Sequence, residues 1–320
     1  MGRATVAEKL ALLCSLVATA GCVSDHRVSP WGGGPPPPIS AFAAPSDLEA
    51  QLDIVDAETR ALGLRQTLEL RGELPRGGGP VVARGYEKSD AAGRKAHAVR
   101  AATAHGVVLA IGPFEQPDLD NRPAELVPAL APDAVSDDDV TRRLTDLNGD
   151  GLPDAVLRNR RGAIEIHRIG PLGSSRYALR MALVPSELAD ADGDGRLDLI
   201  GRADVPDGDP IAPALVDMAT FEDGQYTNAS AGARAFHARL ASPPAARSKT
   251  PPAPIDDATR LRGAIERAWH ALLAGDARAP VLEALGAEPV PQPLRASFDR
   301  HRARIEALPV VAPEARGTAR

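Results

Sequence analysis

One twelve-residue pattern occurs twice in this chain, and its two copies begin 44 residues apart. TDLNGDGLPDAV spans residues 145–156, and ADADGDGRLDLI spans residues 189–200. Both copies place short acidic or amide side chains at alternate positions, with glycine at the same two places between them. Carboxylates two residues apart converge only where the backbone curls around a centre, and glycine lowers the steric cost of that curl. The pattern therefore predicts two cation-binding loops, each leading into a short apolar run.

The oxygen-bearing side chains have the spacing of calcium ligands. With Asp146 and Asp190 as position 1, side-chain oxygens fall at positions 1, 3, 5 and 9, and a backbone carbonyl at position 7 can join them. The expected ligands of two calcium ions are Asp146, Asn148, Asp150, Leu152 and Asp154 in the first loop and Asp190, Asp192, Asp194, Arg196 and Asp198 in the second, with Leu152 and Arg196 contributing carbonyl oxygens.

Two alternatives to a calcium loop need to be weighed. Asp and Gly are also common in solvated turns, but repetition of the oxygen spacing at both places favours metal binding. An EF-hand requires Glu at position 12, where Leu157 and Gly201 stand instead. Without an ion, neighbouring carboxylates repel each other, so we expect an empty loop to open.

The pattern D-x-[DN]-G-D-G-x-x-D ahead of an apolar run resembles the calcium loops of FG-GAP and VCBS repeats, which form blades of β-propellers. The spacing of 44 residues is also that of one four-stranded blade. The resemblance covers residues 138–228 and implies calcium-binding blades there. Because only two such loops occur, it implies a small or incomplete propeller, or a β-sandwich that uses the same loops.

The periodicity of apolar residues predicts an α+β fold, mainly antiparallel β, with a C-terminal helical hairpin or bundle. A capping box of Ser46 and Glu49 begins a predicted helix over residues 47–62. Strands are expected between residues 65 and 112 and again over residues 177–183, with a long surface connection over 113–140. The predicted domains are a signal peptide (1–21), a Pro/Gly-rich tether (22–45), a β-rich domain with an N-terminal helix and calcium loops 146–154 and 190–198 (46–228), a short helix and Pro-rich linker (229–256), and a helical domain (257–310).

The N-terminal segment MGRATVAEKLALLCSLVATAGC predicts secretion, because basic residues precede an apolar run that is too short to span a membrane. Its end resembles the lipobox of bacterial lipoproteins, although Thr19 stands where Leu is usual. The resemblance implies cleavage before Cys22 and a lipid anchor on that cysteine. Plain secretion and an uncleaved anchor are the alternatives. Val23, in place of an Asp that signals inner-membrane retention, favours the outer membrane of the bacterial envelope.

Composition and motifs narrow the function. A net charge of -6 and an aromatic content of 3% argue against nucleic acid as a partner. The sequence contains no G-x-S-x-G, phosphate-loop or H-E-x-x-H motif, so we expect a non-catalytic protein. The main hypothesis is a calcium-stabilised envelope lipoprotein that binds or scaffolds an unknown protein or glycan. The alternative is a metal-dependent hydrolase acting on envelope polymers, with residues 190–198 as its site.

Overall fold

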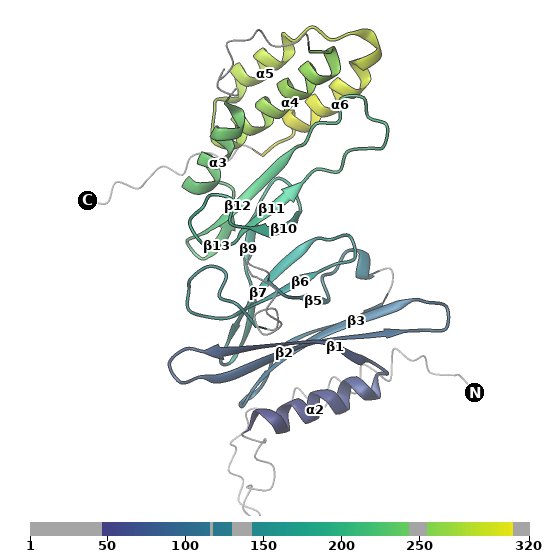
Figure 1. The fold of residues 1–320 in the computed structure, drawn as a ribbon, viewed down its shortest axis with the longest axis vertical. Helices are drawn as coiled ribbons and strands as arrows, with labels where there is room; N and C mark the ends of the chain where they lie inside the picture. The colour runs from purple at the N-terminus through teal and green to yellow at the C-terminus, as the bar shows by residue number, and fades with distance from the viewer. Residues whose placement is uncertain (1–46, 116–117, 130–142, 243–254, 310–320) are drawn as a thin grey trace, which may run out of the picture. The chain divides into compact units, whose positions relative to one another are not determined.

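The computed structural model describes residues 47–115, 118–129, 143–242 and 255–309. These residues belong to one compact unit, Ala44–Arg320. Three mainly antiparallel sheets and several helices, most of them near the C-terminus, confirm the predicted α+β fold (Figure 1). The predicted signal peptide and tether, with Cys22, lie outside the described residues. None of the helices described is both long enough and apolar enough to cross a membrane.

The first sheet is a four-stranded antiparallel meander in the order β1-β2-β3-β4. The strands are β1 (Arg65–Leu74), β2 (Gly79–Ser89), β3 (Lys95–Thr103) and β4 (Gly106–Glu115). Leu74 pairs with Gly79, so the glycine-rich stretch after β1 is a hairpin turn. Helix α2 (Leu48–Ala61) lies along one face of this sheet (Figure 1).

Strand β3 is buried on both faces along most of its length. Because side chains alternate along a strand, Val99 and Ala101 enter one core and Ala98 and Ala102 pack toward α2. The buried Arg100 also points toward the helix and pairs with Glu58 at 3.3 Å. The sheet therefore has α2 on one face and the second sheet on the other.

The second and third sheets contain the two predicted calcium loops. The second sheet has the order β5-β6-β7-β8, and the third has the order β10-β11-β12-β13-β9. Their strands are β5 (Glu125–Val127), β6 (Asp154–Arg158), β7 (Ile164–Gly170), β8 (Gly173–Arg176), β9 (Ala178–Arg180), β10 (Pro185–Ala189), β11 (Asp198–Arg202), β12 (Val216–Glu222) and β13 (Gln225–Thr227). The apolar runs after both loops are buried strands, as predicted.

The chain changes sheets at Tyr177. Strand β8 pairs with β7 before this residue, and β9 pairs with β13, in parallel, after it. The predicted strand over residues 177–183 is therefore wrong in extent, because only Ala178–Arg180 joins a ladder. The Tyr177 ring packs edge-on against Phe221 and Tyr226. This aromatic cluster belongs to the core between the second and third sheets, together with Val156 and Leu199.

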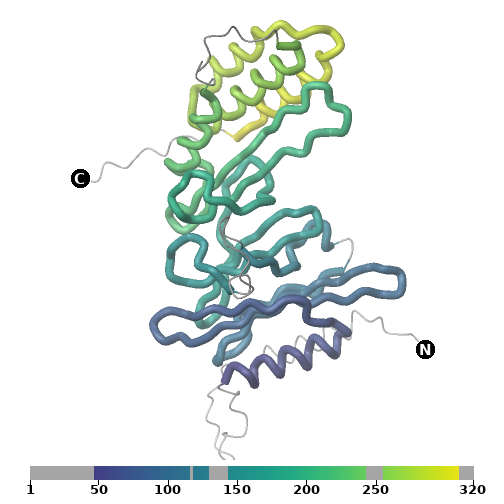
Figure 2. Tube along the Cα trace, in the orientation of Figure 1, coloured from purple at the N-terminus to yellow at the C-terminus, as the bar shows by residue number. Residues whose placement is uncertain are grey.

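The C-terminal region is helical, as predicted, with α3 (Ala231–Ala241), α4 (Asp257–Ala274), α5 (Arg278–Gly286) and α6 (Arg295–Glu306) (Figure 2). Gly275 has a φ of 101° and ends α4, in the left-handed conformation that favours glycine. Trp269 is only 1% exposed, so it is a core residue. Ile211 and Leu215, from the connection between β11 and β12, belong to the same core as α4 and α6.

Two local predictions require correction. The N-cap of α2 is Asp47, whose Oδ1 accepts the Ala50 N–H at 2.7 Å, rather than Ser46. The predicted connection over residues 113–140 contains the end of β4, a 3-10 helix (η2, Asp118–Asp120) and β5. Strand β5 was missed because it is three residues long, and its Leu126 is recognisable as core only once it pairs with Leu157.

Candidate metal centres

Each loop leads directly into an inner strand of its sheet, β6 or β11, and both are closed by the same backbone pairing. Thr145 bridges to Asp154 at the neck of the first loop, and Ala189 pairs with Asp198 at the neck of the second. The glycines inside each loop have φ between 75° and 84°, a left-handed conformation that a Cβ atom disfavours. The two glycines per loop are therefore required by the backbone, as the sequence pattern indicated.

The first loop is held together by hydrogen bonds from backbone N–H groups to its acidic and amide side chains. Asp146 accepts from Gly149 and Gly151, each at 2.8 Å. Asn148 accepts from the Asp150 N–H at 2.9 Å, and Asp150 accepts from the Leu152 N–H at the same distance. Asp154 accepts from the Leu147 N–H at 2.9 Å and so ties position 9 to position 2.

The second loop repeats these bonds position by position. Asp190 accepts from the N–H groups of Gly193 and Gly195, at 2.8 and 3.0 Å. Asp192 accepts from Asp194, and Asp194 accepts from Arg196. Asp198 accepts from the Ala191 N–H at 2.9 Å. The carboxylates of both loops are thus turned onto backbone donors. The opening of an ion-free loop stays a prediction.

Position 9 is buried in both loops, and burial makes a charged carboxylate costly. Asp154 and Asp198 are each 2% exposed, and burial raises the pKa of both carboxyls to about 7. The charges of Asp146 and Asp150 add to the effect at Asp154. In addition, Asp154 Oδ1 has no hydrogen-bond partner within the described residues. A buried, unpartnered carboxylate oxygen in a loop of further oxygens suits a hard cation.

The loops differ in how closely their carboxylates approach each other. One oxygen from each of Asp190, Asp192 and Asp194 lies within 4.8 Å of the others, and this is the only such group of three acidic, His or Cys residues in the described parts of the chain. Asp198 is outside that group. Asp146, Asp150 and Asp154 do not form a corresponding group. Leu152 and Arg196 lie at position 7 of the loops. The binding of calcium by their backbone carbonyl oxygens stays a prediction.

Residues outside the loop sequences also contact the candidate ligands, and the sequence pattern missed them. The Tyr177 hydroxyl accepts the Asn148 Nδ2–H at 2.6 Å and donates to Asp150 Oδ2 at 2.9 Å. Arg168 Nε lies 3.1 Å from the same Asp150 oxygen. Strand alternation hinted at Tyr177 as a core residue, but no local signal connected it to a loop 27 positions earlier.

The two loops lie side by side. The Leu197 N–H donates to the Leu147 carbonyl at 3.4 Å, and a Cβ on Gly149 would lie 3.5 Å from the Arg196 guanidinium. The buried Tyr226 hydroxyl has no partner among the described residues. Burial, with the charges of Asp154 and Asp198, raises its pKa far above the usual range. Both loops therefore act electrostatically on one tyrosine.

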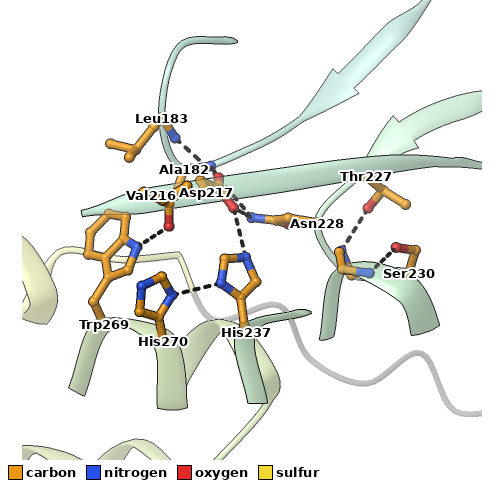
Figure 3. Close-up of polar contacts among 12 residues, drawn as sticks. Ala182, Leu183, Val216, Asp217, Thr227, Asn228, Ser230, His237, Trp269 and His270 are labelled. Atoms are coloured by element: carbon orange, nitrogen blue, oxygen red, sulfur yellow. Dashed lines mark hydrogen bonds and ion pairs between the residues drawn. The ribbon is translucent and has the colours of Figure 1, made fainter. Parts of the chain in front are cut away.

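A second polar cluster, between β12 and helices α3 and α4, contains an aspartate and two histidines (Figure 3). His237 Nε2 lies 3.5 Å from Asp217 Oδ1, and the His237 and His270 rings stack at 5.1 Å. The Asp217 carboxylate also accepts from the N–H groups of Ala182 and Leu183. The side chains of Asp217 and His237 are both 0% exposed, so this cluster connects the helices to the sheet instead of facing solvent.

No protein-family model, curated protein or solved structure matches this chain. The resemblance to FG-GAP and VCBS repeats therefore stays a prediction that rests on the loop pattern.

Proposed function

We propose that this protein is a non-catalytic, calcium-stabilised lipoprotein of the bacterial envelope that presents a β-domain to a protein or glycan partner. The observation that carries the calcium assignment is the buried Oδ1 of Asp154, which has no hydrogen-bond partner among the described residues. The other acidic side chains of this loop accept hydrogen bonds from N–H and O–H groups of the protein, and Asp150 also pairs with Arg168. The gathered oxygens of Asp190, Asp192 and Asp194 support a second site. Two calcium ions are proposed, one in each loop.

Calcium would act here as a structural ion. Each loop leads into an inner strand of its sheet, and the loops contact each other through Leu147 and Leu197. Both leucines belong to the core between the second and third sheets. An ion that replaces the N–H donors around the carboxylates would hold the strand entrances at fixed positions. Its binding would stabilise the folded state by an amount that grows with the logarithm of the ion concentration divided by the dissociation constant.

The envelope location rests on sequence. The signal segment and Cys22 imply a lipid anchor facing away from the cytoplasm, with the outer membrane favoured by Val23. Labelling of the protein by a fatty acid in bacterial cells, lost in a Cys22→Ser variant, tests the anchor. Labelling that persists in the variant, or is missing from the wild type, would contradict it.

Calorimetric titration tests the calcium sites. The mature chain from residue 22, carrying Cys22→Ser, is treated with a chelator and titrated with calcium, and thermal melts are recorded with and without the ion. We expect two binding events, with affinities as weak as about 10⁻⁴ to 10⁻³ M, and a higher melting temperature with calcium. Absence of both heat and a thermal shift would reduce the loops to acidic turns.

The hydrolase alternative requires an open coordination position in a cleft. One groove, of about 780 Å³, is lined by residues such as Arg161, Val184 and Arg202 and by none of Asp190, Asp192 and Asp194. It is a candidate surface for a partner of the β-domain.

A further inference from the structure

Position 5 is an aspartate in both loops, but its surroundings differ. In the first loop, Asp150 Oδ2 accepts the Tyr177 hydroxyl and lies 3.1 Å from Arg168 Nε. Its other oxygen accepts the Leu152 N–H. The Nε atom of Arg168 is buried and makes no hydrogen bond within the described residues. Its contact with Asp150 is therefore an ion pair only. The position-5 carboxylate of the first loop is therefore already neutralised by a cation of the protein itself.

The corresponding aspartate of the second loop has no such partner. Asp194 is exposed and accepts the Arg196 N–H, and no basic side chain forms an ion pair with it in the described part of the chain. One of its carboxylate oxygens lies within 4.8 Å of one oxygen of Asp190 and one of Asp192.

Strand register explains the difference. Arg168 lies directly opposite Asp154 in the β6–β7 ladder. In the third sheet Leu199 pairs with Ala219, so continuing the antiparallel register by one residue places Thr220 opposite Asp198. The Thr220 hydroxyl donates to Ser230 Oγ at 2.6 Å. The second sheet thus has the Arg168 guanidinium beside its loop. At the same place the third sheet has the Thr220 hydroxyl, which bonds to Ser230 instead of to the loop.

We propose that the guanidinium of Arg168 competes with the calcium ion of the first loop for the carboxylate of Asp150. The guanidinium neutralises Asp150 when no ion is bound, and it has to leave that carboxylate before Asp150 coordinates calcium through Oδ2. This inference rests on the proposed calcium function, and the unpartnered Asp154 Oδ1 is the independent sign of a ligand in this loop. The first loop is then the weaker site, and it stays folded without its ion, whereas the second is the stronger and responds to calcium at lower concentration.

The size of the effect follows from Coulomb's law. A guanidinium within about 5 Å of a divalent ion, in surroundings as polar as water, weakens its binding on the order of tenfold. Replacement of Arg168 by a neutral residue removes this repulsion and also frees the Asp150 oxygen. Because the Arg168 side chain is 42% exposed, the substitution does not open a cavity in the core.

The test isolates the first loop by silencing the second with Asp190→Asn and Asp194→Asn, which keep the shape of both side chains. In that background, calcium is titrated calorimetrically into the protein with Arg168 intact, with Arg168→Gln, and with Arg168→Met, which retains the aliphatic stem. Arg176→Gln is the matched control, because Arg176 pairs with Glu165 on the neighbouring strand and makes no ion pair with the first loop. Circular dichroism confirms that each variant is folded.

We expect Arg168→Gln and Arg168→Met to tighten calcium binding by roughly tenfold, and Arg176→Gln by less than about twofold. Binding that appears only when Arg168 is replaced would also support the competitor. Equal affinities with and without Arg168, an equal effect of Arg176→Gln, or no binding even without Arg168 would overturn it. The proposed calcium function is judged separately, by titration of the protein with both loops intact, where binding to the second loop suffices to uphold it.

Discussion

The Nδ1 atoms of His237 and His270 lie 2.9 Å apart, and both rings are buried between α3 and α4. One of these nitrogens has to carry a hydrogen and the other has to lack one, so the pair is stable only while at least one ring is neutral. Burial, and the neighbouring His237, lower the pKa of His270 to about 4. Asp217, on the far side of His237, opposes the shift and does not cancel it.

This pair predicts that His270 contributes less to stability in mild acid than at neutral pH. An unfolded histidine binds a proton below about pH 6.5, and folded His270 does so only near pH 4, so the free energy of unfolding falls as the pH drops through that window. We expect His270 to account for a loss of about 2 kcal/mol between about pH 7 and about pH 5, obtained by urea unfolding as the difference between the wild type and His270→Asn. His270→Asn, whose amide can replace Nδ1 without titrating, should remove this component.

His105→Gln is the control for the acid effect, because His105 is exposed in the turn between β3 and β4. Asp154 and Asp198 act in the opposite direction when calcium is absent, since a raised carboxyl pKa adds stability that is lost as the pH rises through about 7. The difference between wild type and His270→Asn isolates the histidine. An identical pH dependence in the two proteins would contradict the assignment.

A second prediction concerns Gly232, in the first turn of α3. A Cβ at this position would collide with the carboxylate of Asp192 from the second acidic loop. Gly232→Ala should therefore destabilise the calcium-free protein by about 1 kcal/mol, despite the better helix propensity of alanine, and should change calcium affinity at the second loop. Gly263→Ala in α4 meets only the tip of Arg267, at 3.1 Å, and is the matched control. It should be neutral or stabilising in the same thermal melts.

A third prediction concerns the relative contribution of the two loops. Asp194→Ala should reduce calcium affinity more than Asp150→Ala, because the second loop has four carboxylates where the first has three and Asn148. The Arg168 ion pair adds to this difference, since Asp150 already has a positive partner. Calorimetric titration of both variants gives the comparison. A larger loss from Asp150→Ala would reverse the proposed order of the sites.

A fourth prediction concerns Asp209, whose buried carboxylate connects the β11–β12 loop to α6. It accepts from Ser297 and from His301 Nε2, the latter at 2.9 Å, and from two backbone N–H groups. Burial would raise its pKa, but these hydrogen bonds outweigh burial and hold the pKa well below the usual range. Asp209→Asn should cost about 2 to 4 kcal/mol of unfolding free energy at neutral pH.

Chemical denaturation measures the Asp209 effect. The exposed Asp207, two residues earlier in the same loop, is the control, and Asp207→Asn should change the unfolding free energy by less than about 0.5 kcal/mol. Equal stabilities of the two variants would mean that the β11–β12 loop does not depend on this carboxylate.

The sequence by itself determined the elements whose signals are local. The oxygen spacing and glycines placed both loops, and the structure has their glycines in the conformation that this spacing requires. The apolar period placed the start of the helical domain at residue 257, where α4 begins. These signals were readable because turn geometry and helix periodicity depend on residues a few positions apart.

Only the tertiary structure decided what surrounds the loops. Arg168 and Tyr177 reach Asp150 through strand register and a change of sheet, and Asp192 meets Gly232 across 40 residues of chain. The histidine pair required two helices to meet, at His237 and His270. Such contacts depend on how separate elements pack, and one sequence contains no local record of that packing. The position and conformation of each loop were therefore predictable from the sequence. The different neighbours of the two loops, such as Arg168 beside the first, were not.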